Sequence, residues 1–380
     1  MTEETILTNA TIVLADEIVR GTVCLRDGVI ADISDGTTDA GIDLQGDHLL
    51  PGLVELHTDH LEGHYAPRPK VRWNAYAAVL AHDAQIAASG ITTVFDALRV
   101  GNTDGDHDLM TDDMVVLADA IQTGMTDGLY RADHYIHLRC EVSSPDCMQA
   151  WERLGGNEGV RLASLMDHAP GQRQFADLDA YKVYYQGKLK MTDAQFAAFC
   201  DMRIGQSQAN SDRHRTAIAA VARQKNIILA SHDDATGAHV AEAEDNGVRV
   251  AEFPTTEVAA RESHSRGMAV LMGAPNVVRG GSHSGNIAAR TLAENGHLDI
   301  LSSDYIPFSL MQAVFQLADE VDGISLPRAV ATATVNPARA VGLDNRGEIA
   351  IGKRADLARV RRVRGVPVVR AVWRQGARVV

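Results

Sequence analysis

The sequence predicts an α/β protein made of a TIM-like (β/α)8 barrel and a small β-sandwich domain built from both ends of the chain. Three observations predict it. Apolar runs of strand length recur eight times in the middle of the 380-residue chain. Segments of helix length separate many of these runs, which is typical of βα units around a parallel sheet. Both ends instead carry several short apolar runs divided by turn residues.

The candidate barrel strands lie between residues 50 and 340. They are residues 52–56, 92–95, 135–140, 160–166, 227–230, 248–253, 269–272 and 300–302. Candidate helices between them include residues 75–88, 114–123, 193–204 and 213–224. Eight βα units in about 290 residues match the usual size of a (β/α)8 barrel. A doubly wound open sheet is the alternative, but no Gly-x-Gly-x-x-Gly motif follows the first strand.

The two ends of the chain each hold too few residues to close a core alone. The first fifty residues have apolar runs at 6–7, 11–14, 22–25 and 29–33, with a hairpin turn at Asp27-Gly28. The last thirty-five have similar runs at 356–360, 366–373 and 378–380. We therefore expect residues 1–50 and 345–380 to form one β-sandwich domain, with the barrel over residues 51–344. Two unrelated end modules are the alternative.

The composition indicates a folded globular protein rather than a disordered one, because 45% of the residues are hydrophobic and 23% are charged. The net charge of −14 argues against nucleic-acid binding. An anionic ligand would therefore need a local basic cluster.

The location expected from the sequence is the cytoplasm. The first nine residues hold two glutamates and no basic residue, unlike a signal peptide. No run approaches 18 apolar residues, so no membrane-spanning segment is expected. The four cysteines show no Cys-x-x-Cys spacing and are expected to be reduced thiols.

Polar residues that can bind a metal follow most of the candidate strands. His57 and Asp59 stand two residues apart, on one face of an extended chain, and His137 shares a face with Arg139 and Glu141. The other polar residues at strand ends are Asp96, His168, His232, Glu252 and Asp304. In a barrel these ends meet at one mouth, where active sites lie. Because burying so many ionisable groups is costly without a compensating cation, the pattern predicts a metal centre.

Basic and glycine-rich loops follow three of the strands. Arg68 and Lys70 follow the first strand, and Arg173 follows the fourth. Residues 273–286, after the seventh strand, contain four glycines together with Arg279 and His283. Backbone amides and arginine are the groups that phosphate oxygens require. Each loop alone could be a solvated connection, but three at one mouth favour a polyphosphate ligand.

The same residues carry a family resemblance. Residues 50–57 resemble the first-strand signature of the amidohydrolase superfamily, and residues 347–357 resemble its return into a split β-domain. Further blocks resemble one group in that superfamily, the diphosphatases that act on α-D-ribose 1-methylphosphonate 5-triphosphate in the carbon–phosphorus lyase pathway. These blocks are residues 57–59, 68–70, 137–141, 165–172, 230–236 and 273–286. The resemblance covers almost the whole chain.

The resemblance implies a metal-dependent hydrolase that splits this sugar triphosphate into the 5-phosphate and diphosphate. One or two divalent ions are expected, with zinc first and manganese or magnesium as alternatives. Asp304 is the expected general base, with His232 as a second catalytic residue. The ligands assigned on this basis are His57, Asp59, Glu141, His168, His232 and Asp304. The expected substrate-binding residues are Arg68, Lys70, Arg173, Arg279 and His283. A homodimer is the expected assembly.

The sequence departs from the superfamily pattern at three strand ends. The usual His-x-His is His57-x-Asp59 here, and His168 stands where many members have a carboxylated lysine. The usual histidine of strand six is missing, with Glu252 in its neighbourhood. His60 stands where the diphosphatases have asparagine, so we do not expect it to be an essential ligand.

Two other functions are compatible with a barrel of this kind. An amidohydrolase acting on a cyclic amide or an amino-nucleobase would share the barrel but would not need the basic glycine-rich loop. A catalytically inactive scaffold would lack several strand-end residues, whereas nearly every strand here keeps one.

Overall fold

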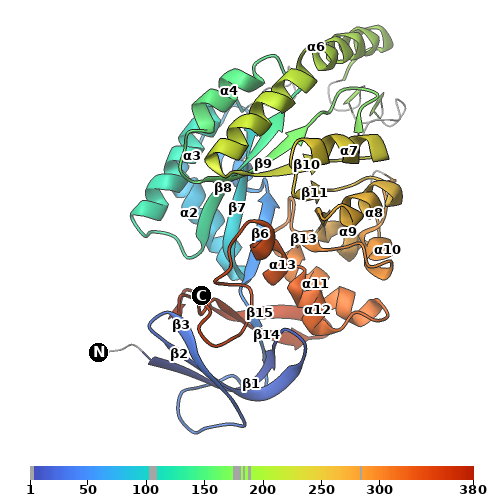
Figure 1. Cartoon of the computed structure of the whole chain (residues 1–380). Coiled ribbons are helices and arrows are strands. Elements are labelled where there is room, and N and C mark those ends of the chain that lie inside the picture. Colours follow the sequence, from blue (N-terminus) through green and yellow to red (C-terminus); the bar gives the residue numbers. More distant parts are fainter. Residues whose placement is uncertain (1–3, 102–108, 174–180, 183–184, 187–189, 283–284) are drawn as a thin grey trace.

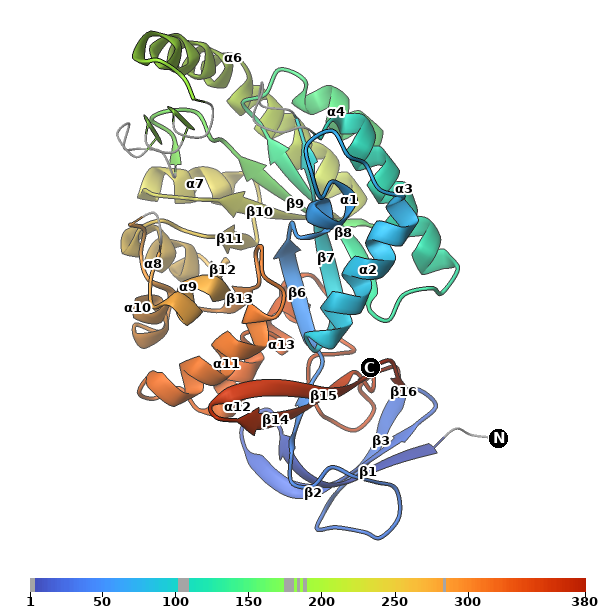
Figure 2. The same cartoon turned by 180° about the vertical axis from the view of Figure 1, so that it is seen from behind.

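The computed structural model describes residues 4–101, 109–173, 181–182, 185–186, 190–282 and 285–380. Within these residues the chain forms a barrel of eight parallel strands surrounded by helices. A second sheet, built from both ends of the chain, lies against one end of this barrel (Figures 1 and 2). The predicted fold class is confirmed.

The barrel contains all eight predicted strands, paired with their neighbours in chain order from β6 to β13. Their bounds are β6 (Leu53–Thr58), β7 (Ile91–Val100), β8 (Asp133–Glu141), β9 (Val160–Met166), β10 (Ile228–His232), β11 (Val250–Glu252), β12 (Ala269–Gly273) and β13 (Ile300–Ser302). A single parallel bridge between Thr58 and Asp304 brings the first and last strands together.

The buried carboxyl group of Glu55 also joins the first strand to the last. Its Oε1 accepts hydrogen bonds from Ser302 Oγ at 2.5 Å and from the His57 backbone N–H at 2.7 Å. Its Oε2 accepts from the Ser303 backbone N–H at 2.6 Å. Glu55 thereby fixes the end of β13, and the residue that follows Ser303, beside the end of β6.

Side chains alternate between the lumen and the outer core along β7 and β8. Phe95 shares one core cluster with apolar side chains from strands across the barrel, so it faces the lumen. Leu98 and Val100 pack in the outer core. The prediction that Asp96 ends the second strand is wrong, because β7 continues to Val100 and Asp96 faces outward. Its carboxylate lies 2.8 Å from His82 Nε2.

The helices lie outside the barrel strands. Within the described residues they are α1 (Leu61–Tyr65), α2 (Ala75–Ala88), α3 (Thr111–Thr126), α4 (Cys147–Leu154), α6 (Asp193–Lys225), α7 (Gly237–Asp245), α8 (Glu257–Ser265), α9 (Ala274–Arg279), α10 (Ala289–Glu294), α11 (Ser309–Glu320), α12 (Leu326–Ala331) and α13 (Val335–Ala340). None of them is long and apolar enough to cross a membrane.

Helix α6 differs from the prediction, which placed two helices at residues 193–204 and 213–224. It is one helix of 33 residues that extends away from the barrel (Figure 1). A capping box of Thr192 and Gln195 begins it, and Asn226 in the left-handed conformation ends it. The polar stretch between the predicted helices contains no proline, so nothing interrupts the backbone hydrogen bonds.

The second sheet contains the strands predicted at both ends of the chain. Its main order is β16-β15-β14-β5-β1-β2-β3, and β4 pairs with β1. The bounds are β1 (Glu4–Val13), β2 (Ile18–Arg26), β3 (Val29–Asp35), β4 (Ile42–Asp43), β5 (His48–Pro51), β14 (Leu357–Val363), β15 (Val366–Arg374) and β16 (Ala377–Arg378). The runs at 6–7 and 11–14 form a single strand, β1, with an irregularity between Leu7 and Ala10.

This sheet curves around a core of its own. Strands far apart in the sheet order contribute to the same cluster, including Ile30 of β3 and Trp373 of β15. The junction of β14 with β5, in which Ala358 pairs with Leu50, joins the two ends of the chain.

Asp133 connects the second sheet to the barrel. It begins β8, at the end of the barrel away from the mouth, and is only 5% exposed. Its Oδ2 lies 2.6 Å from Arg346 Nη1 and 2.5 Å from Arg354 Nη1, and its Oδ1 lies 3.3 Å from Arg374 Nε. One buried carboxylate thus holds three arginines from the C-terminal segment.

Candidate active site

Glu252, the last residue of β11, lies at the centre of the barrel mouth. Its Oε1 is 3.1 Å from Nδ1 of His57 on β6, and its Oε2 is 3.2 Å from Nδ1 of His232 on β10. The two imidazole rings stack with centroids 5.7 Å apart. A neutral imidazole that donates from Nδ1 carries its lone pair on Nε2, which is how carboxylates orient histidine ligands of metals. Glu252 therefore orients both histidines so that Nε2 of each can bind a cation.

His137 on β8 completes a first group of donor atoms. The ligand atoms of His57, His137 and Glu252 lie within 4.8 Å of one another, and all three residues are buried. Burial lowers the pKa of His137 to about 3, so this imidazole is neutral. Burial raises the pKa of Glu252, but His57 and His137 reverse the effect and hold it well below its usual range.

A second group consists of His168, His232 and Asp233, whose ligand atoms also lie within 4.8 Å of one another. His168 Nδ1 is 2.6 Å from Glu141 Oε2, and its Nε2 is 3.7 Å from Asp233 Oδ2. Burial lowers the pKa of His168, but the charges of Glu141 and Asp233 outweigh the effect of burial and raise this pKa to about 10. The proton on His168 therefore balances buried carboxylates, which a divalent cation would balance as well.

Asp304 follows β13 and lies beside His57. Its backbone N–H donates to the carbonyl oxygen of His57 at 3.1 Å. Its φ of 56° is left-handed, which costs a non-glycine residue about 1–2 kcal/mol. Burial, with the nearby charge of Asp59, raises the pKa of Asp304 to about 6. A carboxylate that titrates near neutrality suits a general base.

The two groups fit a divalent cation. Histidine nitrogens and carboxylate oxygens are the donors that zinc takes in hydrolases, and manganese and other divalent metals also accept them. The buried carboxylates of Glu141, Asp233 and Glu252 supply the negative charge that such an ion needs.

The structure brings all six predicted metal ligands to the mouth. Glu141 contacts His168, and Asp59 forms a 3.1 Å ion pair with Arg139 on β8. In the described residues, therefore, these two carboxylates hold a neighbouring side chain, while His57, His168 and His232 belong to the two donor groups and Asp304 lies beside His57 outside both groups. Their role as ligands stays a prediction.

The predicted substrate-binding cations are more dispersed. Arg68 and Lys70 are exposed after α1, and Arg279 is exposed at the end of α9, a short helix that replaces part of the predicted glycine-rich loop. Arg173 is buried and pairs with Asp234 and Glu242, so its charge is already neutralised. His283 lies outside the described residues.

Three residues of the site have no role in the sequence-based prediction. There His137 only shares a face of the third strand with two other polar residues, Glu252 only ends the sixth strand near a missing histidine, and Asp233 only stands among the polar residues that end the fifth strand. His137 and Glu252 stand on predicted strands, and Asp233 directly follows β10. Position alone could therefore have singled them out.

The sequence has relatives of known identity. Residues 84–380 match the amidohydrolase family. The chain is 47% identical over 377 residues to the α-D-ribose 1-methylphosphonate 5-triphosphate diphosphatase of Escherichia coli (strain K12). The matched residues cover 98% of this chain and 100% of the relative.

Solved structures share the fold at lower identity. N-acetyl-D-glucosamine-6-phosphate deacetylase from Mycobacterium smegmatis matches with a TM-score of 0.62 and 19% identity, over 99% of this chain and 100% of the other. 5-Methylcytosine deaminase from Klebsiella pneumoniae, liganded with phosphonocytosine, matches with a TM-score of 0.65 and 16% identity, over 99% and 98%.

Proposed function

Because the chain belongs to the amidohydrolase family, we propose that it is a metal-dependent hydrolase that converts α-D-ribose 1-methylphosphonate 5-triphosphate to the 5-phosphate and diphosphate. The observation that carries the proposal is the 47% identity, over almost the full length of both chains, to an enzyme with this activity. The carboxylate-held histidines at the mouth support it.

The proposed ligands of the divalent ion are His57, Asp59, Glu141, His168, His232 and Asp304. Glu252 and Glu141 support this by holding Nδ1 of three histidines, which leaves Nε2 of each as the ligand nitrogen. Zinc is the proposed metal, because the donors combine imidazole and carboxylate. When bound, the ion would acidify a water molecule and offset charge on the phosphoryl oxygens.

Asp304 is the proposed general base. The oxygen of a water molecule bonds to phosphorus, the α–β bridging P–O bond breaks, and the proton of the water passes to the Asp304 carboxylate. The left-handed backbone at Asp304 and its N–H bond to the His57 carbonyl fix where this carboxylate stands. His232, stacked on His57, is the proposed second catalytic residue.

The triphosphate also needs cations from the protein, since the chain carries a net charge of −14. We propose Arg68, Lys70, Arg173, Arg279 and His283 for this role. Arg173 would first have to leave Asp234 or Glu242. A homodimer in the cytoplasm is the proposed form of the protein.

The test is product analysis by phosphorus NMR after incubation of the zinc-loaded protein with the sugar triphosphate. Release of diphosphate and the 5-phosphate is expected, and a chelator should stop it. Release of ammonia from an amino-nucleobase, with the triphosphate left intact, would favour the amidohydrolase alternative and overturn the proposal.

A further inference from the structure

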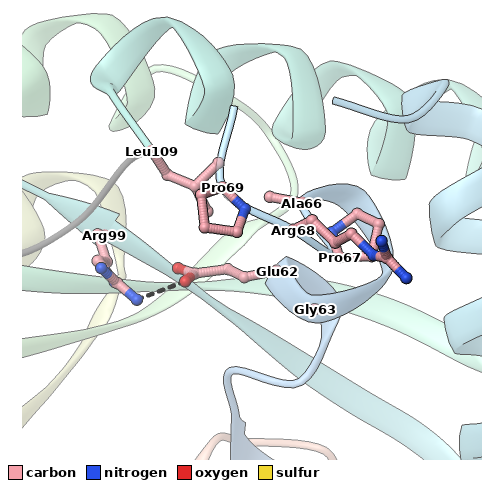
Figure 3. A pocket seen from close by; sticks show the side chains of 8 residues that line it. All are labelled: Glu62, Gly63, Ala66, Pro67, Arg68, Pro69, Arg99 and Leu109. Atoms are coloured by element: carbon pink, nitrogen blue, oxygen red, sulfur yellow. Dashed lines mark hydrogen bonds and ion pairs between the residues drawn. The ribbon is translucent and has the colours of Figure 1, made fainter. Parts of the chain in front are cut away.

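A pocket of about 350 Å³ opens on the rim of the barrel mouth, between α1 and the end of β7. It is lined by Glu62, Gly63, Ala66, Pro67, Arg68, Pro69, Arg99 and Leu109. Arg99 and Arg68 lie on opposite sides of it, with Glu62 between them (Figure 3). Arg99 is a cation to which the sequence assigned no role.

The register of the barrel places Arg99 beside the active site. Phe95 faces the lumen, so Arg99, four residues later on the same strand, faces the same side above it. In the parallel pairing of β7 with β8, Arg99 stands opposite Arg139. The two guanidinium groups therefore enter the mouth from neighbouring strands at one level.

Two carboxylates hold this pair of arginines. Glu62 Oε2 lies 2.5 Å from Arg99 Nη2, and Asp59 Oδ2 lies 3.1 Å from Arg139 Nη1. Glu62 is buried, yet its Oε1 has no hydrogen-bond partner among the described residues, and neither has Nε of Arg139. Unpaired buried polar atoms are costly, and an oxyanion that accepts from Arg139 Nε–H would relieve that part of the cost, whereas Glu62 Oε1 needs a donor that an anion does not supply.

Charge around the pocket favours an anion. Among the described residues that line the pocket, Arg68 and Arg99 supply two positive charges against the single carboxylate of Glu62, and Arg139 beside them pairs with Asp59. If Asp59 serves a divalent ion, as proposed above, Arg139 loses its partner and the excess of positive charge grows. A planar guanidinium binds phosphoryl and phosphonyl oxygens through two parallel N–H groups.

We propose that this pocket binds one terminal phosphorus oxyanion of the substrate, with Arg99 as its main contact and Glu62 as the group that holds Arg99 until the anion arrives. The inference rests on the proposed function. Arg279 follows β12, three strands from β7 around the eight-stranded barrel, so it lies nearly across the mouth. A substrate with an anionic group at each end would then span the mouth between the two arginines.

The two partners of the Glu62–Arg99 ion pair give opposite predictions. Arg99→Met should raise KM for the triphosphate about 10-fold or more, with a smaller change in kcat, because it removes a charged contact to the anion. Glu62→Gln should lower KM about 2- to 5-fold, because it removes a carboxylate that competes for Arg99. An ion pair that only supports the fold would make both variants less active, which would overturn the proposal.

A matched control is Arg153→Met. Arg153 also forms a surface ion pair, at 2.7 Å to Asp112, but it lies on α4 outside the pocket. Its kinetics should equal those of the unchanged enzyme. Circular dichroism of all variants identifies any that fail to fold, and Arg99→Lys, which keeps the charge, should recover part of the loss in KM.

Two probes distinguish the ends of the substrate. Methylphosphonate and inorganic pyrophosphate are each tested as inhibitors of the unchanged enzyme and of Arg99→Met. The inhibitor whose binding weakens in the variant identifies the end that the pocket holds. If neither weakens, the proposal is wrong.

Failure of the proposed function would be visible separately, as an unchanged enzyme that releases no diphosphate. The pocket is then tested by calorimetric titration of the same two probes into the metal-loaded protein. Weaker binding of one probe to Arg99→Met would still support an anion site, and equal binding of both would overturn it.

Discussion

At the scale of single residues, Asp304 gives the most direct test of the chemistry. Asp304→Asn keeps the backbone N–H bond to His57 but removes the group proposed to accept a proton. The turnover number should fall by about 10²–10⁴, the usual contribution of a general base. Steady-state kinetics, with metal content and thermal midpoint as controls, would check this. Full activity in the variant would remove Asp304 from the role.

His134 predicts how stability depends on pH. This buried side chain lies outside the lumen, with Nδ1 2.7 Å from Asp96 and Nε2 3.4 Å from Asp83. Burial lowers the pKa of His134, but the two carboxylates outweigh the effect of burial and raise this pKa to about 9. A folded pKa above the unfolded value of about 6.5 stabilises the protein fully below pH 6.5, and the effect is lost as the pH rises through 9.

The free energy of unfolding should therefore drop by on the order of 3 kcal/mol between pH 6.5 and 9.5 through this residue. His134→Gln should lack that drop. Urea unfolding of both proteins across the range gives the difference, in which the titrating groups that do not interact with His134 cancel. A difference that stays constant with pH would contradict the prediction.

The polar residues at the mouth could be predicted because they stand at the ends of apolar strands, as His57, His232 and Asp304 do. Their partners could not. Glu252 meets His232 through the pairing of β10 with β11, but its contact with His57 on β6 crosses the barrel, and only barrel closure brings those two residues within hydrogen-bonding distance. Arg173 shows the same limit, since its carboxylate partners lie about 60 and 70 residues later.

At the scale of elements, strand and helix centres followed from the apolar pattern, whereas their ends depended on tertiary contacts. β7 continues past Asp96 because its outer face packs against α2, where His82 Nε2 lies 2.8 Å from the Asp96 carboxylate. Helix α6 continues through a polar stretch because Ser207 and Ser211 donate to Asp167 there, at 2.8 and 2.7 Å. The spacing of apolar residues alone predicts neither of these contacts, and so neither end of the two elements.

Gly52 tests the junction of β5 with β6. A Cβ on this residue would lie under 3.0 Å from the side chain of Thr92 on the neighbouring strand. Gly52→Ala should therefore reduce the free energy of unfolding by about 1–3 kcal/mol through overpacking. Adding Thr92→Ala should recover part of the loss, as measured by urea denaturation.

The control is the same substitution where space is open. Gly205 lies within α6, and a Cβ on this residue would meet no other atom within 4 Å outside the helix's own backbone. Gly205→Ala should stabilise the protein by about 0.5–1 kcal/mol through helix propensity. Loss of stability in both variants would show that the cost at Gly52 does not come from Thr92.

At the scale of the whole molecule, the sequence indicated that both ends build one unit, since neither end holds enough strands alone. We propose that residues 1–50 and 345–380 form this domain and residues 51–344 the barrel. The contacts between the two could not be foreseen, because nothing in the sequence links Asp133 to Arg346 and Arg354 before β14 or to Arg374 at the end of β15.

Asp133→Asn should lower the stability of the protein, through the contact between the second sheet and the barrel, without changing catalysis at the barrel mouth. It leaves Arg346, Arg354 and Arg374 with less buried negative charge, which should cost about 3–5 kcal/mol of unfolding free energy. The turnover number at low temperature should remain unchanged, because Asp133 lies at the far end of the barrel. Asp319→Asn, which breaks an exposed pair with Arg362, should cost about 0–1 kcal/mol.

The pairing of Leu50 with Ala358 also sets the order in which the chain can be completed during synthesis. About 300 residues separate the two strands, so at about 5–20 residues per second the ribosome makes the second strand some 15–60 s after the first. Through that interval one edge of β5 has no partner, and Leu49 and Leu50 lack much of their final cover. The N-terminal strands must therefore be protected from pairing with other nascent chains until the last residues emerge. A message truncated near its 3′ end would yield a chain with an unpaired, aggregation-prone strand edge.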